Sequence, residues 1–333
     1  MKTTLIAAIA ATVVATSLAT GAMAQDKVVF GTNWLAQGGH GGFYQALADG
    51  TYAKYGLEVE IQQGGPQVNN RPMLAAGKVD FLMAGNLLLS FDNVRNGIPT
   101  VVVASYFEKD PQVLIAHKGA YKDWADLANA PQILISKDGQ FSFWQWMTAT
   151  QGFKDEQLRP YGYNLAEFLN DPMMVQQGYA TAEPMSAEAA GSPVDTFILA
   201  DYGWNTYSTT IEARTEMVEQ NPDLVQRFVD ASTIGWYNYL YNDPSLGNAA
   251  IMAANPELTE DGLKAEVAQL KALGIIGSGF QADMGIGAID LKRVQAFYDA
   301  AVAAKIIEAG SVDVTKVATD QFVNKKVGMD LIK

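Results

Sequence analysis

The sequence predicts an α/β protein with two domains, built from parallel sheets that are covered by helices on both faces. Three observations support this fold class. The chain has 333 residues, about twice the usual length of one domain. Hydrophobic residues make up 49% of it and charged residues 18%, which is typical of a globular protein. Short apolar runs alternate with helical patterns, as in βαβ units.

The alternation is most regular in the first third of the chain. Glycines end several of the expected helices at the position after the last helical turn, where glycine is favoured. A Gly-Gly-Pro turn follows the second strand. The expected strands are residues 28–31, 57–61, 79–83, 101–105 and 113–116, and the expected helices are residues 43–55, 69–76 and 87–96.

The remaining chain repeats the theme less regularly and ends in helices. Strands are expected at 133–136 and 196–200, and an aromatic-rich helix at 141–151. Asn221 and Pro222 are typical of the N-cap and first position of a helix. This begins a long amphipathic helix that runs to Pro244, and we expect two more helices at 259–273 and 290–306. The longest flexible stretch is expected at 278–287.

Composition excludes several classes of protein. The chain has no cysteine, so disulfide frameworks, cysteine-ligated zinc modules and thiol enzymes are ruled out. The formal net charge of -13 disfavours binding to nucleic acid or to an anionic membrane, because both require a basic surface. Only two histidines are present, so we expect no metal site, and no motif indicates a cofactor.

Residues 1–24 are typical of a secretory signal peptide. Lys2 supplies the positive start, residues 5–14 form the apolar region, and Ala22-Met23-Ala24 is a small-x-small cleavage site. The apolar region is too short and too rich in Ala and Thr for a membrane anchor. We therefore expect a mature protein that begins at Gln25, carries no lipid and is exported to the periplasm.

Several segments together resemble one family of binding proteins. They are NWLAQGGHGGFYQALADGTYAKYGLEVEI at 33–61, AAGKVDFLMAGN at 75–86, GYATAEP at 178–184, FILADYGWN at 197–205 and NPDLVQRFVDASTIGW at 221–236. Their order and spacing resemble the NitT/TauT-type substrate-binding proteins of ABC importers. Within that family, the sequence resembles the branch similar to thiamine-pyrimidine synthases and pyrimidine-precursor-binding proteins.

The resemblance implies a two-lobed, type II-like periplasmic binding protein. Each lobe would hold a mostly parallel sheet flanked by helices, with the ligand in the cleft between the lobes. Lobe one would comprise residues 26–116 and 206–333, and lobe two residues 118–204. The regular βαβ pattern also breaks near His117 and again near residues 201–207. Closure about two such crossings is a common way to trap a ligand.

Ligands of open α/β sheets bind at the carboxyl ends of the strands, which selects the strand-to-helix turns. These turns are rich in aromatic residues, whose rings clamp flat ligands, and in small residues that let backbone amides approach a ligand. The candidate ligand-binding residues are Trp34, His40, Gly65, Asn69, Gly85, Asn86, Phe107, Phe141, Phe143, Trp144, Glu183, Tyr202 and Trp204.

Some of these residues have a plain structural alternative. Phe143 and Trp146 lie at helical spacing and fit a core equally well. Glu183 suits either a ligand-binding acid or an exposed loop position, and His40 either a ligand contact or a structural role. Arg71 is the cation nearest the expected cleft and suits either pairing with an anionic ligand or a solvated position on a helix.

The function expected from these features is a periplasmic receptor that passes a small molecule to an ABC permease and its ATPase. An aromatic cleft with one acid favours a flat heterocycle, such as an aminopyrimidine thiamine precursor. The alternatives are an aromatic carboxylate and a sulfonate or nitrate. An enzyme like the pyrimidine synthases is disfavoured, because those resemble one another in a Cys-rich motif that this chain lacks. We expect a monomer that binds no nucleic acid.

Overall fold

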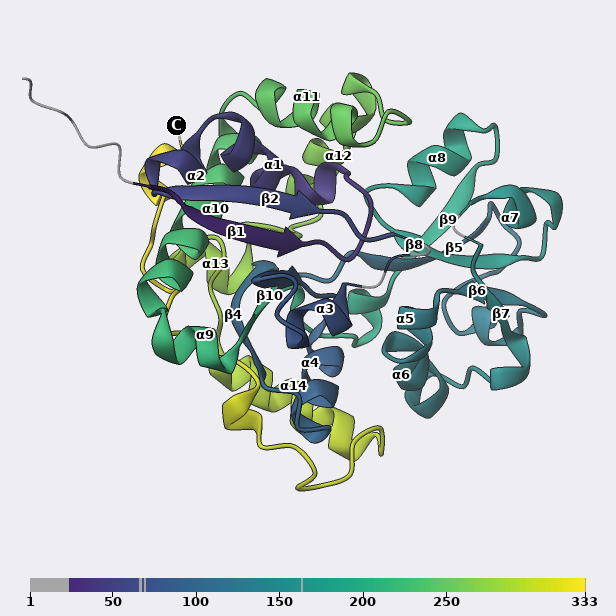
Figure 1. The fold of residues 1–333 in the computed structure, drawn as a ribbon. Helices are drawn as coiled ribbons and strands as arrows, with labels where there is room; N and C mark the ends of the chain where they lie inside the picture. Colours follow the sequence, from purple (N-terminus) through teal and green to yellow (C-terminus); the bar gives the residue numbers. More distant parts are fainter. Residues whose placement is uncertain (1–23, 66–67, 69, 163, 333) are drawn as a thin grey trace, which may run out of the picture.

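The computed structural model describes residues 24–65, 68, 70–162 and 164–332, so the expected signal peptide lies outside the described residues except for Ala24. Two five-stranded sheets form the centres of two lobes (Figure 1). Within the described ranges, no helix is both long and apolar enough to cross a membrane.

The first sheet has the order β2-β1-β3-β10-β4. Its strands are β1 (Asp26–Gly31), β2 (Leu57–Gln62), β3 (Phe81–Met83), β4 (Thr100–Phe107) and β10 (Ser208–Arg214). β1 is parallel to β2 and β3, whereas β10 is antiparallel to both β3 and β4. Only β10 therefore runs against the others, which confirms a mostly parallel sheet.

The second sheet repeats this arrangement in the order β7-β6-β8-β5-β9. Its strands are β5 (Gln112–His117), β6 (Ile133–Ile135), β7 (Leu158–Pro160), β8 (Val175–Tyr179) and β9 (Val194–Ile198). β6 is parallel to β7 and β8, and β5 is antiparallel to β8 and β9. In each sheet the reversed strand is the one that follows a crossing between the lobes.

Helices cover both faces of the first sheet (Figure 1). The helices of this lobe are α1 (Gly41–Ala48), α2 (Thr51–Lys54), α3 (Arg71–Ala75), α4 (Leu87–Arg95), α9 (Thr215–Gln220), α10 (Pro222–Tyr241), α11 (Ser245–Ala254), α12 (Glu260–Ala272), α13 (Gly279–Met284) and α14 (Leu291–Ala303). The second lobe has α5 (Lys137–Gln140), α6 (Phe143–Thr150), α7 (Ala166–Asn170) and α8 (Glu183–Ala189). Short 3₁₀ turns include η1 (Gly38–His40) and η4 (Leu199–Tyr202).

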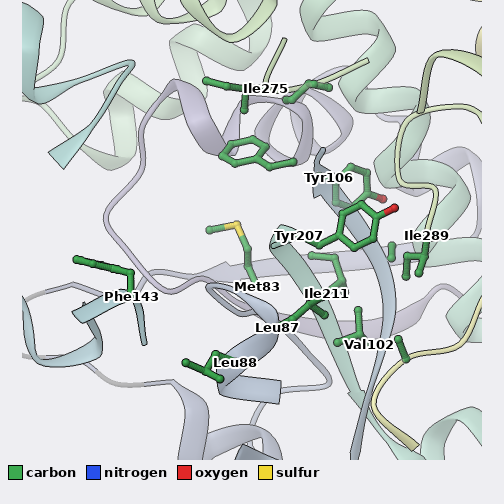
Figure 2. Packing of buried hydrophobic residues seen from close by; sticks show 14 of the residues in the cluster. Met83, Leu87, Leu88, Val102, Tyr106, Phe143, Tyr207, Ile211, Ile275 and Ile289 are labelled. Atoms are coloured by element: carbon green, nitrogen blue, oxygen red, sulfur yellow. The ribbon is translucent and has the colours of Figure 1, made fainter. Parts of the chain in front are cut away.

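The core of the first lobe follows from the two-residue period of its strands. Phe30 and Phe81 face α10, where Phe228 stacks on Phe81 with ring centroids 4.0 Å apart. Val29 packs with a small cluster on the other face that includes Leu82. Figure 2 shows part of the main core, including Val102 and Ile211 on the paired strands β4 and β10. Both faces are buried, as a helix-covered sheet requires.

One helix expected as a single element is interrupted. Gly50 adopts a left-handed φ of 76° and divides the helix expected at 43–55 into α1 and α2. The helix expected at 141–151 is confirmed as α6, and the short helix α5 before it was not expected. Strands β7, β8 and β10 were not expected from the sequence.

The stretch 278–287, expected to be flexible, is ordered by specific contacts. It contains α13, and the side chain of Gln281 is buried and donates to the carbonyl of Ser105 over 2.8 Å. The amide of Ser105 donates in turn to the carbonyl of Gly287 over 3.0 Å. The segment therefore packs as an extension of the first lobe along β4.

The first crossing between the lobes lies earlier than expected. β5 pairs with β8 and β9, so residues 112–116 belong to the second sheet, and the chain crosses at residues 108–111 rather than at 117. The second crossing spans η4 and residues 203–207, between β9 and β10. The sequence did not predict this crossing, because β4 and β5 are consecutive apolar strands. Their sequences do not show which sheet each strand joins.

One arginine of α14 connects the two crossings. Arg293 donates to the Glu108 carboxylate over 2.8 Å and to the Glu108 carbonyl over 2.8 Å. It also donates to the carbonyl of Thr206 over 3.1 Å, and its guanidinium lies 4.1 Å from the ring centre of Tyr207. Separately, Trp204 donates through its indole N–H to Asp110 over 3.0 Å. The crossings are thus fixed side by side at the base of the cleft.

Candidate functional site

A cavity of about 120 Å³ lies between the lobes and is partly open to solvent. Its walls are polar and aromatic and come from both lobes. The lining residues are Asn33, Trp34, Gln37, Gly85, Asn86 and Leu89 from the first lobe, and Gln112, Ser136, Asp138, Gly139, Ser142, Phe143, Tyr161, Gln177, Gly178, Tyr179 and Glu183 from the second.

The turn after β1 brings Trp34 to the cavity. The hydroxyl of Thr32 donates to the carbonyl of Trp34 over 2.7 Å and accepts from the amide of Gly64 at 3.3 Å. A Cβ on Gly64 would stand 2.5 Å from the carbonyl oxygen of Thr32, so only glycine permits this approach. The two turns that end β1 and β2 are therefore locked together, with Trp34 at the carboxyl edge of the sheet.

The Gly-Gly-His-Gly-Gly segment that follows is compressed against the helices behind it. A Cβ on Gly41 would meet the Tyr239 ring at 1.9 Å, and one on Gly42 would meet Trp236 at 2.2 Å. His40, which precedes these two glycines, is buried, and burial lowers the pKa of its imidazole to about 3, so the ring is neutral. His40 does not line the cavity, so of the two alternatives, a ligand contact and a structural role, its position fits the structural role.

The turn after β3 contributes Gly85 and Asn86. Asn86 is the N-cap of α4, and its side-chain oxygen accepts from the amide of Leu88 at 3.2 Å. An amide side chain at an N-cap uses its oxygen in this way, so its NH₂ group is the part that can donate to a ligand. The helix start thus faces the cavity beside Leu89.

The second lobe presents Phe143 opposite the first-lobe turns. Ser136 caps α5 by accepting from the amide of Gly139 at 3.1 Å. A Cβ on Gly139 would lie 2.6 Å from the Phe143 ring, so the ring packs directly on the glycine backbone. Asp138, on the same short helix, is exposed and lines the cavity. An aromatic face and a carboxylate are therefore placed side by side.

Glu183 is the best-placed acid of the cavity. Its carboxylate accepts from the amide of Tyr179 at 2.7 Å and from the hydroxyl of Tyr161 at 3.4 Å. Burial raises the pKa of Glu183, and these two donors partly oppose the effect. A Cβ on Gly178 would stand 2.6 Å from the Cβ of Glu183, so glycine makes room for the side chain to fold back over β8. The acid is fixed at the cavity wall rather than on an exposed loop.

The structure brings five of the expected residues into this cavity: Trp34, Gly85, Asn86, Phe143 and Glu183. Other expected residues have structural contacts elsewhere. Phe107 is buried against Trp236, and the indole N–H of Trp144 donates to Asp155 over 2.9 Å. Their aromatic rings therefore pack in the cores of the lobes and do not contact the ligand cavity.

The remaining expected residues also lie away from the cavity. Tyr202 stacks on Trp124 with ring centroids 4.4 Å apart, and Trp204 is held in the second crossing. Phe141 is 57% exposed and lines a separate groove between the lobes. Gly65 forms an isolated bridge with Val68 and does not line the cavity. Asn69 lies outside the described residues.

Several lining residues were not expected from the sequence. They are Gln37, Leu89, Gln112, Ser136, Asp138, Gly139, Tyr161, Gln177, Gly178 and Tyr179. Gln177 and Tyr179 stand two residues apart on β8, which places them on one face of the sheet. The strand Val-Gln-Gln-Gly-Tyr was missed because its amides weaken the apolar pattern. Its position just before the Ala-Thr-Ala-Glu-Pro turn was the available signal.

Among the described residues that line the cavity there is no lysine, arginine or histidine. Nor do the described ranges contain a group of three metal-ligating side chains that could hold an ion. Rings, amides, hydroxyls and two carboxylates are thus the chemistry available. Such a set can stack on a flat molecule and accept hydrogen bonds from it.

The chain is similar to proteins with several functions. It is 24% identical over 294 residues to the riboflavin-binding protein RibY of Chloroflexus aurantiacus, covering 84% of this chain and 81% of that protein. The fold matches the periplasmic nitrate-binding protein NrtA of Synechocystis PCC 6803 at a TM-score of 0.64 and 15% identity, covering 90% and 87% of the chains.

It also matches the desulfurization enzyme DSZB at a TM-score of 0.55 and 12% identity, covering 90% of this chain and 97% of the enzyme. Binding proteins and an enzyme thus share the fold, so the fold by itself does not decide between these classes. The family model described as NMT1/THI5 like matches residues 37–246. This match extends over most of both sheets and over the cavity walls of the second lobe, and the chain belongs to the NMT1/THI5-like family.

Proposed function

We propose that this protein is a periplasmic receptor for a small flat heterocycle that carries hydrogen-bond donors, which it delivers to an ABC importer. The observation that supports this most is the cavity lining. Aromatic side chains face it from both lobes, two carboxylates line it, and no cationic side chain does so among the described residues. An aminopyrimidine related to thiamine precursors fits this chemistry.

The geometry suggests how such a ligand is held. Trp34 comes from the first lobe and Phe143 from the second, so a planar ring between them would connect the lobes. Each aromatic contact of this kind contributes about 0.5–1.5 kcal/mol beyond the burial of area. Glu183 accepts from an amino group or ring N–H, and such a bond to a carboxylate is worth about 1.5–3 kcal/mol. A receptor of this type closes about its two crossings.

The charge of the cavity favours this ligand over anions. A sulfonate, nitrate or aromatic carboxylate is bound most strongly where a cationic side chain pairs with its charge. Arg71, the cation nearest the expected cleft, donates instead to the carbonyl of Leu89 over 3.1 Å and to Asn93 over 2.9 Å, and it does not line the cavity. Two carboxylates at the wall would also repel an anion. RibY, which binds a flat heterocycle by its name, is consistent with the proposal.

An enzymatic role is the second candidate, since the same fold serves the desulfurization enzyme DSZB. The chain has no cysteine, whereas the pyrimidine synthases that it resembles share a Cys-rich motif. The expected signal peptide also fits a role outside the cytosol. We therefore favour a receptor that acts as a monomer and meets a permease and ATPase complex at the inner membrane.

A thermal-shift screen of the mature protein tests the ligand class. The probes are an aminopyrimidine thiamine precursor, riboflavin, benzoate, taurine and nitrate. The proposal expects the aminopyrimidine or riboflavin to raise the Tm, since a ligand that binds only the folded state stabilises it. Stabilisation by taurine, nitrate or benzoate, with no response to either heterocycle, would overturn the proposal.

Paired variants then locate the site by titration calorimetry with the probe that responds. Trp34→Ala should weaken binding about tenfold or more, whereas Phe141→Ala, an exposed aromatic outside the cavity, should bind like the parent. Glu183→Gln removes the charged acceptor, and Glu188→Gln on the exposed side of α8 is its control. Equal binding by Trp34→Ala, Glu183→Gln and the parent would place the ligand elsewhere.

A further inference from the structure

A buried carboxyl group stands directly behind the turn that carries part of the cavity wall. Glu266 lies on α12, far along the chain from the turn, and its side chain is buried. Helix α12 packs on η1, whose first two residues are Gly38 and Gly39. Gln37, which precedes them, lines the cavity. Glu266 therefore contacts the back of a segment whose front faces the ligand site.

The contact is closer than any side chain at Gly38 would allow. A Cβ there would lie 2.5 Å from Oε2 of Glu266 and 2.8 Å from its Cβ. Gly38 therefore packs directly on the carboxyl group of Glu266, with no side chain between them. Gly39 in turn lies against Gln37: a Cβ on Gly39 would stand 3.6 Å from the side-chain nitrogen of Gln37. A continuous set of contacts thus runs from Glu266 to the cavity wall.

The environment of Glu266 is unfavourable for a purely structural residue. Its Oε2 atom is buried and has no hydrogen-bond partner among the described residues. Buried polar atoms without a partner destabilise a fold. An apolar side chain of similar size would fill the same space without this penalty. The acid is thus better explained by what it does for the turn than by what it does for the core.

We propose that Glu266 is a positioning residue of the interlobe cavity, holding the Gly38–Gly39 turn and with it Gln37 in the place from which they meet a ligand. The effect on a ligand rests on the proposed function, but the placement of the turn does not. The side chain itself does not line the cavity, so Glu266 acts through the turn rather than by touching the ligand.

Hydrogen–deuterium exchange of the full mature chain tests this with three variants. Glu266→Ala removes the side chain that packs behind Gly38, Glu266→Gln keeps its volume without the charge, and Glu257→Ala is an exposed control near the same helix. We expect Glu266→Ala to speed exchange in peptides covering residues 36–40 about tenfold, because the turn loses the side chain packed against it. Glu266→Gln should stay within about twofold of the parent.

A second readout uses the fluorescence of riboflavin as the probe of binding. Glu266→Ala should weaken riboflavin binding about tenfold, and Glu266→Gln should restore most of it. Unchanged exchange at 36–40 in Glu266→Ala, or equal acceleration across the whole first lobe, would overturn the proposal. Turn-specific acceleration with unchanged riboflavin affinity would overturn its link to the ligand. If the parent does not bind riboflavin, that counts against riboflavin as a ligand, and the exchange result still decides the role of Glu266.

Discussion

The buried acid of α12 makes a quantitative prediction about stability and pH. Burial raises the pKa of Glu266 to about 8 from the ordinary value of 4.5, with the nearby charge of Glu183 adding to the rise and the amides of Gly38 and Gly39 opposing it. Because the pKa is higher in the folded state, the folded protein holds this proton where the unfolded chain has released it. Between pH 4.5 and 8, the free energy of unfolding therefore falls as pH rises.

The size of the effect follows from the shift. Each pKa unit corresponds to about 1.4 kcal/mol of unfolding free energy. The parent therefore loses at most about 5 kcal/mol of stability through this group between pH 4.5 and 8, and about 3 kcal/mol of it is lost by pH 7. Glu266→Gln cannot ionise and lacks this dependence. The variant should thus gain stability relative to the parent as pH rises from 5 to 8, with no further gain above that range.

Urea unfolding at several pH values measures this difference, because the other titrating groups cancel between the two proteins. Glu257→Gln, an exposed residue, is the matched control and should follow the parent at every pH. The reasoning is refuted if Glu266→Gln and the parent keep a constant difference in unfolding free energy from pH 5 to 8. It is also refuted if the parent gains stability relative to Glu266→Gln over this range.

Three further predictions concern the two crossings and the part of the cavity wall that holds Glu183. Trp204→Phe removes the indole donor to Asp110 and should lower the free energy of unfolding by about 1–3 kcal/mol in urea, whereas an unchanged value would show that the bond contributes nothing. Arg293→Met removes the cation that connects both crossings and should cost about 3 kcal/mol, with calorimetric unfolding as the measurement and a change within 0.5 kcal/mol as the contrary result. Gly178→Ala forces a methyl group against Glu183 and should weaken binding of the responding ligand, which calorimetry would contradict if the affinity stayed the same.

The architecture could be predicted from the sequence because it depends on local patterns. Apolar runs such as residues 28–31 and glycines such as Gly56 mark the ends of strands and helices. The assignment of β5 to the second sheet could not be predicted in this way, because Val113–Ala116 is equally apolar in either lobe. Pairing between strands far apart in the chain decides it. Gln281 likewise orders a segment expected to be flexible through a contact with β4.

The site was less predictable than the fold. Trp34 and Phe143 could be predicted because they stand at turns next to strand ends. Aromatic residues at similar turns, such as Trp144 and Tyr202, contact the second lobe away from the cavity, since their partners Asp155 and Trp124 lie elsewhere in the chain. A turn position restricts where a side chain begins, and tertiary contacts decide which way it points.

One measurement tests the central claim most directly. Native mass spectrometry of the protein purified from periplasm would give the mass of any molecule that it carries, and near-ultraviolet absorption of the released molecule would show whether it is aromatic. The account predicts a small aromatic heterocycle with amino or ring N–H groups, lost from Glu183→Gln and retained by Glu188→Gln. A bound sulfonate, nitrate or other non-aromatic anion would contradict it.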